Sequence, residues 1–205
     1  VTEPPNAPSS TLGHSVGAWS TFFSDDFELA GGWTVFAGAY SGNWERADPQ
    51  QVLNLGAVTQ PADDHTTGSG ALCYVTGPLA GLSASAFDVD GGPSRLTSPA
   101  FDLAGRDAIV SYWRWYYMSV TLDDLLEVAV TPDGLNWTVV EEVRRRESAG
   151  VFKEWHVTDY ITPTATVQIR FTVNDTDPGS LIESLIDDFE IRYVACEPPH
   201  PGDMN

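Results

Sequence analysis

The chain has 205 residues, 29 of them acidic and 10 basic, which gives a formal net charge of −19. Nucleic acids and anionic membrane surfaces bind clustered Lys and Arg, so this charge argues against both as partners and favours cations. The sequence contains no apolar stretch long enough to cross a bilayer, and we expect no membrane insertion. The length fits one domain with a well-developed core.

Residues 1–20 are rich in Pro, Ser, Gly and Thr, which predicts a linker or an irregular N-terminal arm. Strand-like runs with aromatic and β-branched residues then follow one another, with Gly, Pro and Asp between them. No amphipathic helix of three turns interrupts the runs. The pattern predicts an all-β domain over residues 21–195, made of two packed antiparallel sheets.

The letters DDFE occur at residues 25–28 and again at residues 187–190. Both copies stand in strand-like contexts, SDDFELAGGW and LIDDFEIRYV, which predicts two terminal strands lying close together. Carboxylates on neighbouring strands repel one another unless protons, hydrogen bonds or a cation compensate, and a hard divalent ion suits oxygen ligands. Either the two copies share a cation, or they are solvated strand ends that match by chance.

The loop at residues 59–70, TQPADDHTTGSG, is polar and rich in turn-forming residues. Its side chains Asp63, Asp64, His65 and Thr66 either ligate a cation or cap turns. The DVDGG segment at residues 88–92 poses the same choice, because it resembles the start of a calcium loop without the downstream acidic ligand.

Residues 109–118 are apolar or aromatic on both alternating faces, which predicts a central strand. Trp113, Trp115 and Tyr117 share one face, and the other face carries Tyr112, Arg114, Tyr116 and Met118. Aromatic side chains on a concave sheet can stack against sugar rings, whereas core packing explains the same stripe without a ligand. Both interpretations stay open.

Two local patterns predict turns. Asp133 and Gly134 stand between two strand-like runs and indicate a tight hairpin, because Gly tolerates positive φ. The basic run at residues 144–146 is flanked by Glu residues, which is typical of a solvated hairpin rather than a binding site.

The order of these motifs resembles the MAM domain, the extracellular module of meprins, neuropilins and receptor tyrosine phosphatases, and more closely its bacterial secreted relatives. The matching stretches, between residues 22 and 194, are DDFE followed by GGW, NWERADP, QPADDHT, RLTSPAFDL, SYWRWYYM and LIDDFEI. The usual cysteine pattern of the family is absent. The resemblance implies a two-sheet jelly-roll sandwich.

The resemblance also implies a structural cation site that joins the first strand, the DHT loop and the last strand. Carried over by position, its ligands are Asp26, Glu28, Asp64, Thr66 and Asp188. We expect the ion to be Ca²⁺, with sodium as the alternative, and we expect its binding free energy to add to folding.

The last ten residues, 196–205, predict a stiff Pro-rich linker to a missing C-terminal segment, because GDMN resembles the opening of a dockerin-type calcium loop. The chain has two cysteines, Cys73 and Cys196, which match no zinc motif. They either form one disulfide or stay free, and export favours the disulfide.

We expect that the protein is not an enzyme, because its His residues are scattered along the sequence and neither GxSxG nor HExxH occurs. The leading hypothesis is a non-catalytic, calcium-stabilised module, secreted or at the cell surface of a bacterium, that serves adhesion or protein contact within a larger extracellular protein. One alternative is a carbohydrate-binding module of a secreted hydrolase, with Trp113, Trp115 and Tyr117 as ligand-binding residues. Another is a structural subunit of a surface layer or filament. The expected partner is therefore a protein or a glycan at the cell surface.

Overall fold

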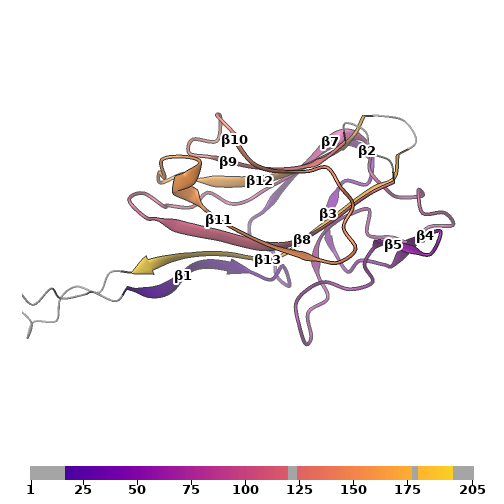
Figure 1. Ribbon diagram of the computed structural model, residues 1–205, viewed down its shortest axis with the longest axis horizontal. Coiled ribbons are helices and arrows are strands. Elements are labelled where there is room, and N and C mark those ends of the chain that lie inside the picture. The colour runs from indigo at the N-terminus through magenta and orange to yellow at the C-terminus, as the bar shows by residue number, and fades with distance from the viewer. Residues whose placement is uncertain (1–16, 120–123, 177–179, 196–205) are drawn as a thin grey trace, which may run out of the picture.

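Two antiparallel sheets lie face to face in the computed structural model, which describes residues 17–119, 124–176 and 180–195 (Figure 1). The expected all-β sandwich is therefore confirmed. No helix within these ranges has the length and apolar character needed to cross a membrane. The predicted C-terminal linker, Cys196, the dockerin-like segment and most of the N-terminal arm lie outside the described residues.

The six-stranded sheet has the order β11-β8-β13-β6-β3, and β1 pairs with β13 beside this path. Its strands are β1 (Ala18–Asp25), β3 (Trp44–Ala47), β6 (Cys73–Thr76), β8 (Ala108–Met118), β11 (Val151–His156) and β13 (Ile182–Ala195). The five-stranded sheet has the order β10-β9-β12-β7-β2. Its strands are β2 (Thr34–Ser41), β7 (Asp90–Thr97), β9 (Leu126–Thr131), β10 (Thr138–Val143) and β12 (Gln168–Asp175). A small hairpin joins β4 (Val52–Asn54) to β5 (Ala57–Gln60), and one 3-10 turn, η1, covers Val157–Asp159.

The core fills the space between the sheets, as alternating burial along the strands requires. On β12 every second residue is buried, so Ile169, Phe171 and Val173 face the core. On β8 the core-facing aromatic residues are Tyr112 and Tyr116, both fully buried. Burying a large apolar side chain stabilises a fold by about 1.5–3 kcal/mol, so these rows account for the pairing of the two layers.

The predicted central strand is confirmed, because β8 lies between β11 and β13. The predicted meeting of the two terminal strands is confirmed as well. β1 pairs with β13 from Ala18 opposite Ala195 to Asp25 opposite Phe189, which brings the two DDFE copies side by side. β1 begins at Ala18, inside the segment expected as an arm.

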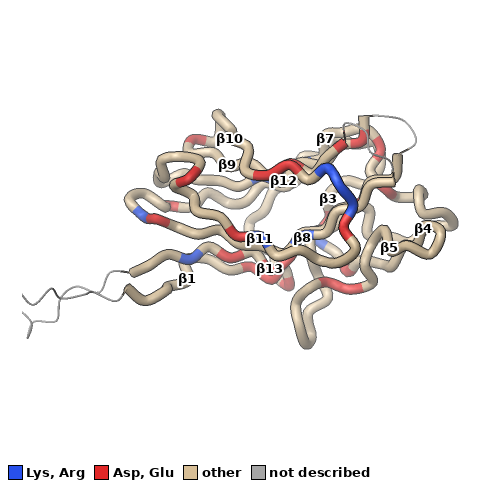
Figure 2. The backbone as a smooth tube through the Cα atoms, in the orientation of Figure 1, with Lys and Arg blue, Asp and Glu red and all other residues tan. Residues whose placement is uncertain are grey.

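The turn predicted at Asp133 and Gly134 occurs, whereas the hairpin expected at residues 144–146 does not, because β10 and β11 belong to different sheets. Gly134 has a φ of 74° in the hairpin between β9 and β10, where Oδ1 of Asp133 accepts hydrogen bonds from the amides of Leu135 and Asn136. Figure 2 shows acidic residues along both layers and one long basic stretch in the connection from β10 to β11. Residues 144–146 are all exposed there, and Arg144 pairs with Glu142 at 3.1 Å.

Candidate functional site

The first DDFE copy makes a tight turn where β1 ends. Oδ1 of Asp25 accepts a hydrogen bond from the amide of Phe27 at 2.9 Å, and its Oδ2 accepts one from Nε1 of Trp33 at 3.0 Å. Phe27 has a φ of 60° and is fully buried against Trp33, with the two ring centroids 5.3 Å apart. The strained turn is therefore held by a core aromatic ring and a capping carboxylate.

The second copy interrupts the pairing of β13 with β8. The register shifts between Asp187 and Glu190, which is a β-bulge, and Asp188 inside it has a φ of 46°. The side chain of Asp187 is fully buried. Its Oδ2 accepts hydrogen bonds from the amides of His65 at 2.6 Å and Thr66 at 3.1 Å, and its Oδ1 accepts one from the amide of Asp188 at 2.8 Å. Burial raises the pKa of Asp187 to about 7, although these amide bonds oppose the rise.

The neighbouring Asp188 contacts side chains of the same loop. Its Oδ1 accepts a hydrogen bond from Oγ1 of Thr66 at 2.8 Å, and its Oδ2 lies 2.6 Å from Nδ1 of His65. The second contact is a hydrogen bond when His65 has a proton on Nδ1, since the carboxylate oxygen can only accept. The ring of His65 stacks on Trp113 with a centroid distance of 3.7 Å and an interplanar angle of 16°. The loop is thus fixed to β13 and to β8 at once.

Glu28 fixes the other end of the loop. Its Oε1 accepts hydrogen bonds from the amides of Ala71 and Leu72, both at 2.7 Å, and these bonds hold the pKa of Glu28 below its usual value. The turn that precedes it is tied to β3, because Nη1 of Arg46 donates to the carbonyl of Phe27 at 3.0 Å. We call the meeting place of residues 25–28, 64–72 and 187–190 the acidic junction.

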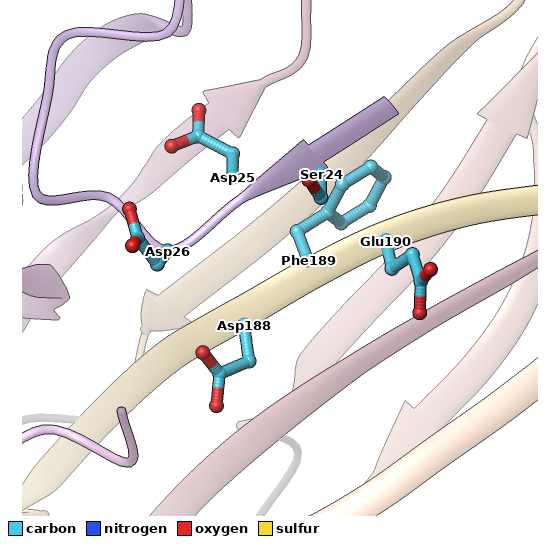
Figure 3. Close-up of a pocket in the computed structure, with 6 residues that line it drawn as sticks. All are labelled: Ser24, Asp25, Asp26, Asp188, Phe189 and Glu190. Atoms are coloured by element: carbon cyan, nitrogen blue, oxygen red, sulfur yellow. The ribbon is translucent and has the colours of Figure 1, made fainter. Parts of the chain in front are cut away.

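A cavity of about 300 Å³ opens where the two DDFE copies meet (Figure 3). It is lined by Ser24, Asp25, Asp26, Asp188, Phe189 and Glu190. In Figure 3 the carboxylates of Asp26 and Asp188 lie on facing segments, whereas Glu190 points away from both. Glu190 instead accepts a hydrogen bond from Oγ1 of Thr21 at 2.8 Å. The two identical tetrapeptides therefore contribute different side chains to the cavity.

The acidic junction meets some of the requirements of a cation site. Oδ2 of Asp64 is buried without a hydrogen-bond partner, and burial raises the pKa of Asp64 to about 6, with Asp63, Glu28 and Asp188 adding to the rise. Glu28, Thr66 and Asp188 gather around the same loop, as the sequence predicts. Nevertheless, no three His, Cys, Asp or Glu side chains in the described ranges stand in a metal-binding arrangement. Binding an ion there would require Asp64 and Asp188 to turn toward a common point.

Asp187 is the residue that sequence reasoning did not single out. Its register partner on β8 is Trp113, so it lies on the outer face of the six-stranded sheet beneath the loop that contains His65. The available signal is the period of two along β13: Ile186 faces the core, so the next residue faces outward. That signal places Asp187 but does not show that a loop covers it.

The aromatic residues Trp113, Trp115 and Tyr117 lie on this outer face too. Trp115 is 5% exposed, and its Nε1 donates to the carbonyl of Thr59 at 2.9 Å. Tyr117 is 3% exposed, and Trp113 is half-buried under His65. Cavities of about 160 and 360 Å³ adjoin the stripe on either side of Trp115. Most of the stripe therefore serves as a packing surface for the loop and the β4–β5 hairpin.

Exposed apolar side chains gather at the end of β2. Tyr40 is 95% exposed, Leu79 50% and Phe87 40%, and all three line one cavity of about 270 Å³. Leu82 is fully exposed on the same connection from β6 to β7. We call these four residues the apolar patch.

No protein-family model and no curated protein sequence matches the chain. Among solved structures, the chain is similar to the K3 cleaved adhesin domain of Lys-gingipain from Porphyromonas gingivalis W83, with 16% identity and a TM-score of 0.53, over 85% of this chain and 99% of that one. The K1 cleaved adhesin domain of the same protein is similar too, with 15% identity and a TM-score of 0.53, over 87% of this chain and 100% of that one. The CBM22-1 xylan-binding domain from Paenibacillus barcinonensis Xyn10C has 12% identity and a TM-score of 0.48, over 88% of this chain and 99% of that one.

At these identities the likeness shows the fold alone, which is a β-sandwich. The resemblances to the MAM domain and to a dockerin stay predictions.

Proposed function

We propose that the chain is a non-catalytic binding module of a secreted or cell-surface protein, acting in adhesion through protein contact. The apolar patch is the observation that carries this proposal. Tyr40 is almost wholly exposed and lines one cavity with Leu79 and Phe87, and Leu82 is fully exposed on the same connection from β6 to β7. Apolar side chains gathered in this way mark protein contacts in soluble proteins.

The chemistry of the acidic junction supports a role without catalysis. A general base needs a free lone pair aimed at a substrate. Asp187 and Glu28 instead accept hydrogen bonds from backbone amides, and Nδ1 of His65 is taken up by Asp188. These contacts tie the loop to the two terminal strands, so the acidic junction holds the domain closed.

The test replaces Tyr40 and Leu79 together by Ser and measures binding to a panel of purified extracellular matrix proteins by biolayer interferometry. We expect binding of at least one protein to weaken ten-fold or more, which corresponds to about 1.4 kcal/mol. Leu135→Ser is the matched control, because Leu135 is 82% exposed but lies on the β9–β10 hairpin. No binding to any of these proteins, or equal loss in the control, would overturn the proposal.

We also propose that Ca²⁺ stabilises the acidic junction, with sodium as the alternative. The unpartnered, buried Oδ2 of Asp64 supports this, as does the mutual repulsion of Asp64, Glu28 and Asp188. All-oxygen ligands are those that Ca²⁺ prefers. When bound, the ion would supply the positive charge that these carboxylates lack.

A second candidate function is glycan binding, as in a carbohydrate-binding module. The observation that favours it lies away from the aromatic stripe. Three buried polar atoms on the outer face of the five-stranded sheet, Nε of Arg95, Nε of Arg170 and Oγ1 of Thr172, have no hydrogen-bond partner. Such atoms are suited to the hydroxyl and carboxylate groups of a sugar.

A further inference from the structure

The outer face of the five-stranded sheet presents basic and hydroxyl side chains on adjacent strands. On β12, Ile169 and Phe171 face the core, so Arg170 and Thr172 face outward. Thr172 pairs with Arg95 on β7 and with Glu127 on β9. In Figure 1 this sheet forms the upper layer, and no described segment lies above it. The face is therefore open to a ligand.

Within the described residues, Arg95 has no ion pair and Arg170 has only a weak one. Their Nε atoms are buried without a hydrogen bond, as is Oγ1 of Thr172 between them. Nη2 of Arg170 lies 3.8 Å from Oε1 of Glu127, so this ion pair is loose. Burial and the charge of Arg95 both lower the pKa of Arg170. Because leaving a buried donor without a partner costs about 1–3 kcal/mol, an acceptor toward which the guanidinium groups turn gains that free energy back.

Aromatic rings flank the two guanidinium groups and hold their planes. The guanidinium of Arg95 lies 5.2 Å from the ring centroid of Phe36 on β2, and that of Arg170 lies 4.0 Å from Trp137 next to β10. Stacking covers a guanidinium plane but leaves the N–H groups at its edge free, in the fork that matches a carboxylate. Phe36 is itself 56% exposed. The row from β2 to β10 spans about 19 Å, at about 4.8 Å per strand, which is long enough for a short oligosaccharide.

We propose that this face binds a glycan that carries uronic-acid carboxylates, with Arg95 and Arg170 as the groups that recognise the carboxylate. The inference rests on the glycan-binding candidate above. A carboxylate satisfies the unpartnered donors and neutralises two like charges, whereas a neutral sugar leaves that repulsion in place. Phe36 and Trp137 offer apolar edges to sugar rings, and Thr172 offers a hydroxyl. Glu127, 3.8 Å from Arg170, offsets part of the positive charge of this face, and negative charges farther away than about 8 Å act weakly because salt screens them.

The test measures binding of the full chain to short oligogalacturonates and to the same oligomers after methyl esterification, by isothermal titration calorimetry. Esterification removes the charge and keeps the sugar rings. We expect the esterified oligomers to bind at least ten-fold more weakly, and we expect Arg170→Gln and Arg95→Gln each to weaken binding of the free acid by at least ten-fold. Added salt should weaken it too.

The matched control is Arg192→Gln, because Arg192 lies on β13 of the other sheet, where it pairs with Glu154. A thermal melt of each variant shows that the fold is kept. If free and esterified oligomers bind equally, or if Arg170→Gln and Arg95→Gln bind as the unchanged chain does, the inference is wrong while glycan binding stands. If neither form binds and neutral xylan and galactan oligomers also fail, glycan binding itself is wrong.

Discussion

The buried carboxyl group of Asp88 should make the stability of the protein depend on pH. Asp88 is 1% exposed and lies just before β7 begins at Asp90. Burial raises its pKa to about 7, and the charges of Asp90 and Asp175 add to the rise. The backbone amides of Asp88 and Ile182 lower the pKa by a smaller amount. The buried Glu183, on β13, faces the same group, and the charge of Asp88 raises its pKa further.

The sign follows from proton binding. The pKa of Asp88 is raised from 3.8 to about 7, so the folded state holds more protons than the unfolded state between these values. Stability therefore falls as pH rises through this window, and the loss is complete above pH 7. Asp88→Asn removes the titration. Between pH 5 and pH 8.5, the free energy of unfolding falls over about two pH units below the pKa of about 7. At 1.36 kcal/mol per unit this loss is at most about 2.7 kcal/mol.

The assay is urea denaturation of Asp88→Asn and the unchanged chain at pH 5 and at pH 8.5. The variant should gain about 2–3 kcal/mol relative to the unchanged chain on going from the lower to the higher pH. Comparing the two pH values cancels the cost of fitting the amide, because that cost is the same at both. Asp90→Asn, at an exposed site two residues away, is the control and should show a much smaller difference. An equal effect of Asp88→Asn at both pH values would refute the reasoning.

Two further predictions concern charge at other sites. After chelation, adding Ca²⁺ at about 100 times its Kd should raise the melting temperature by about 5–10 °C, because the ion binds only the folded chain. Asp188→Asn should abolish this rise. An unchanged melting temperature of the original chain would contradict a calcium site. Arg114→Met should cost about 3–5 kcal/mol in urea denaturation, because it leaves the carboxylates of Glu141 and Glu147 buried without their main partner. Adding Glu141→Leu should restore part of that loss, and no recovery would mean that the packing of Arg114 matters more than its charge.

The fold could be predicted from the sequence because most strands and turns have a signal in their own residues. The alternation on β12 and the doubly apolar run of β8 each follow from a period of two, and burial confirms both. The β9–β10 hairpin was predictable because Gly134 stands where the turn needs positive φ. The two copies of DDFE, one near each end of the domain, predicted the pairing of β1 with β13. This prediction does not depend on the strands between them.

The candidate sites could be predicted only in part. The grouping of Glu28, Asp64 and Asp188 followed from the family resemblance. The burial of Asp187 did not, because the loop that covers its carboxylate, with His65 and Thr66, lies far away in the sequence. Nor did the bulge at Asp188, which shifts the register of β13 on β8. Bulges depend on the contacts of both partner strands, so the letters of one strand do not show them.

The outer face of the five-stranded sheet was missed for a related reason. Arg95 and Arg170 are far apart in the sequence and stand in unremarkable strand contexts. They become neighbours only because β7 pairs with β12 in a register that places Arg95 opposite Thr172. Long-range pairing of this kind has no local signal, whereas the aromatic stripe of β8 is obvious in the sequence and is largely buried.

The two copies of DDFE show how one tetrapeptide can serve two purposes. In the first copy Asp25 caps the turn around Phe27, and in the second Asp187 accepts amide hydrogen bonds from the loop. Both sets of contacts belong to the six-stranded sheet, whose outer face the loop and the β4–β5 hairpin cover at Trp113 and Trp115. The five-stranded sheet has neither cover. The acidic junction and the proposed glycan-binding face therefore lie on opposite layers, so we expect the stability of the first and the affinity of the second to change independently.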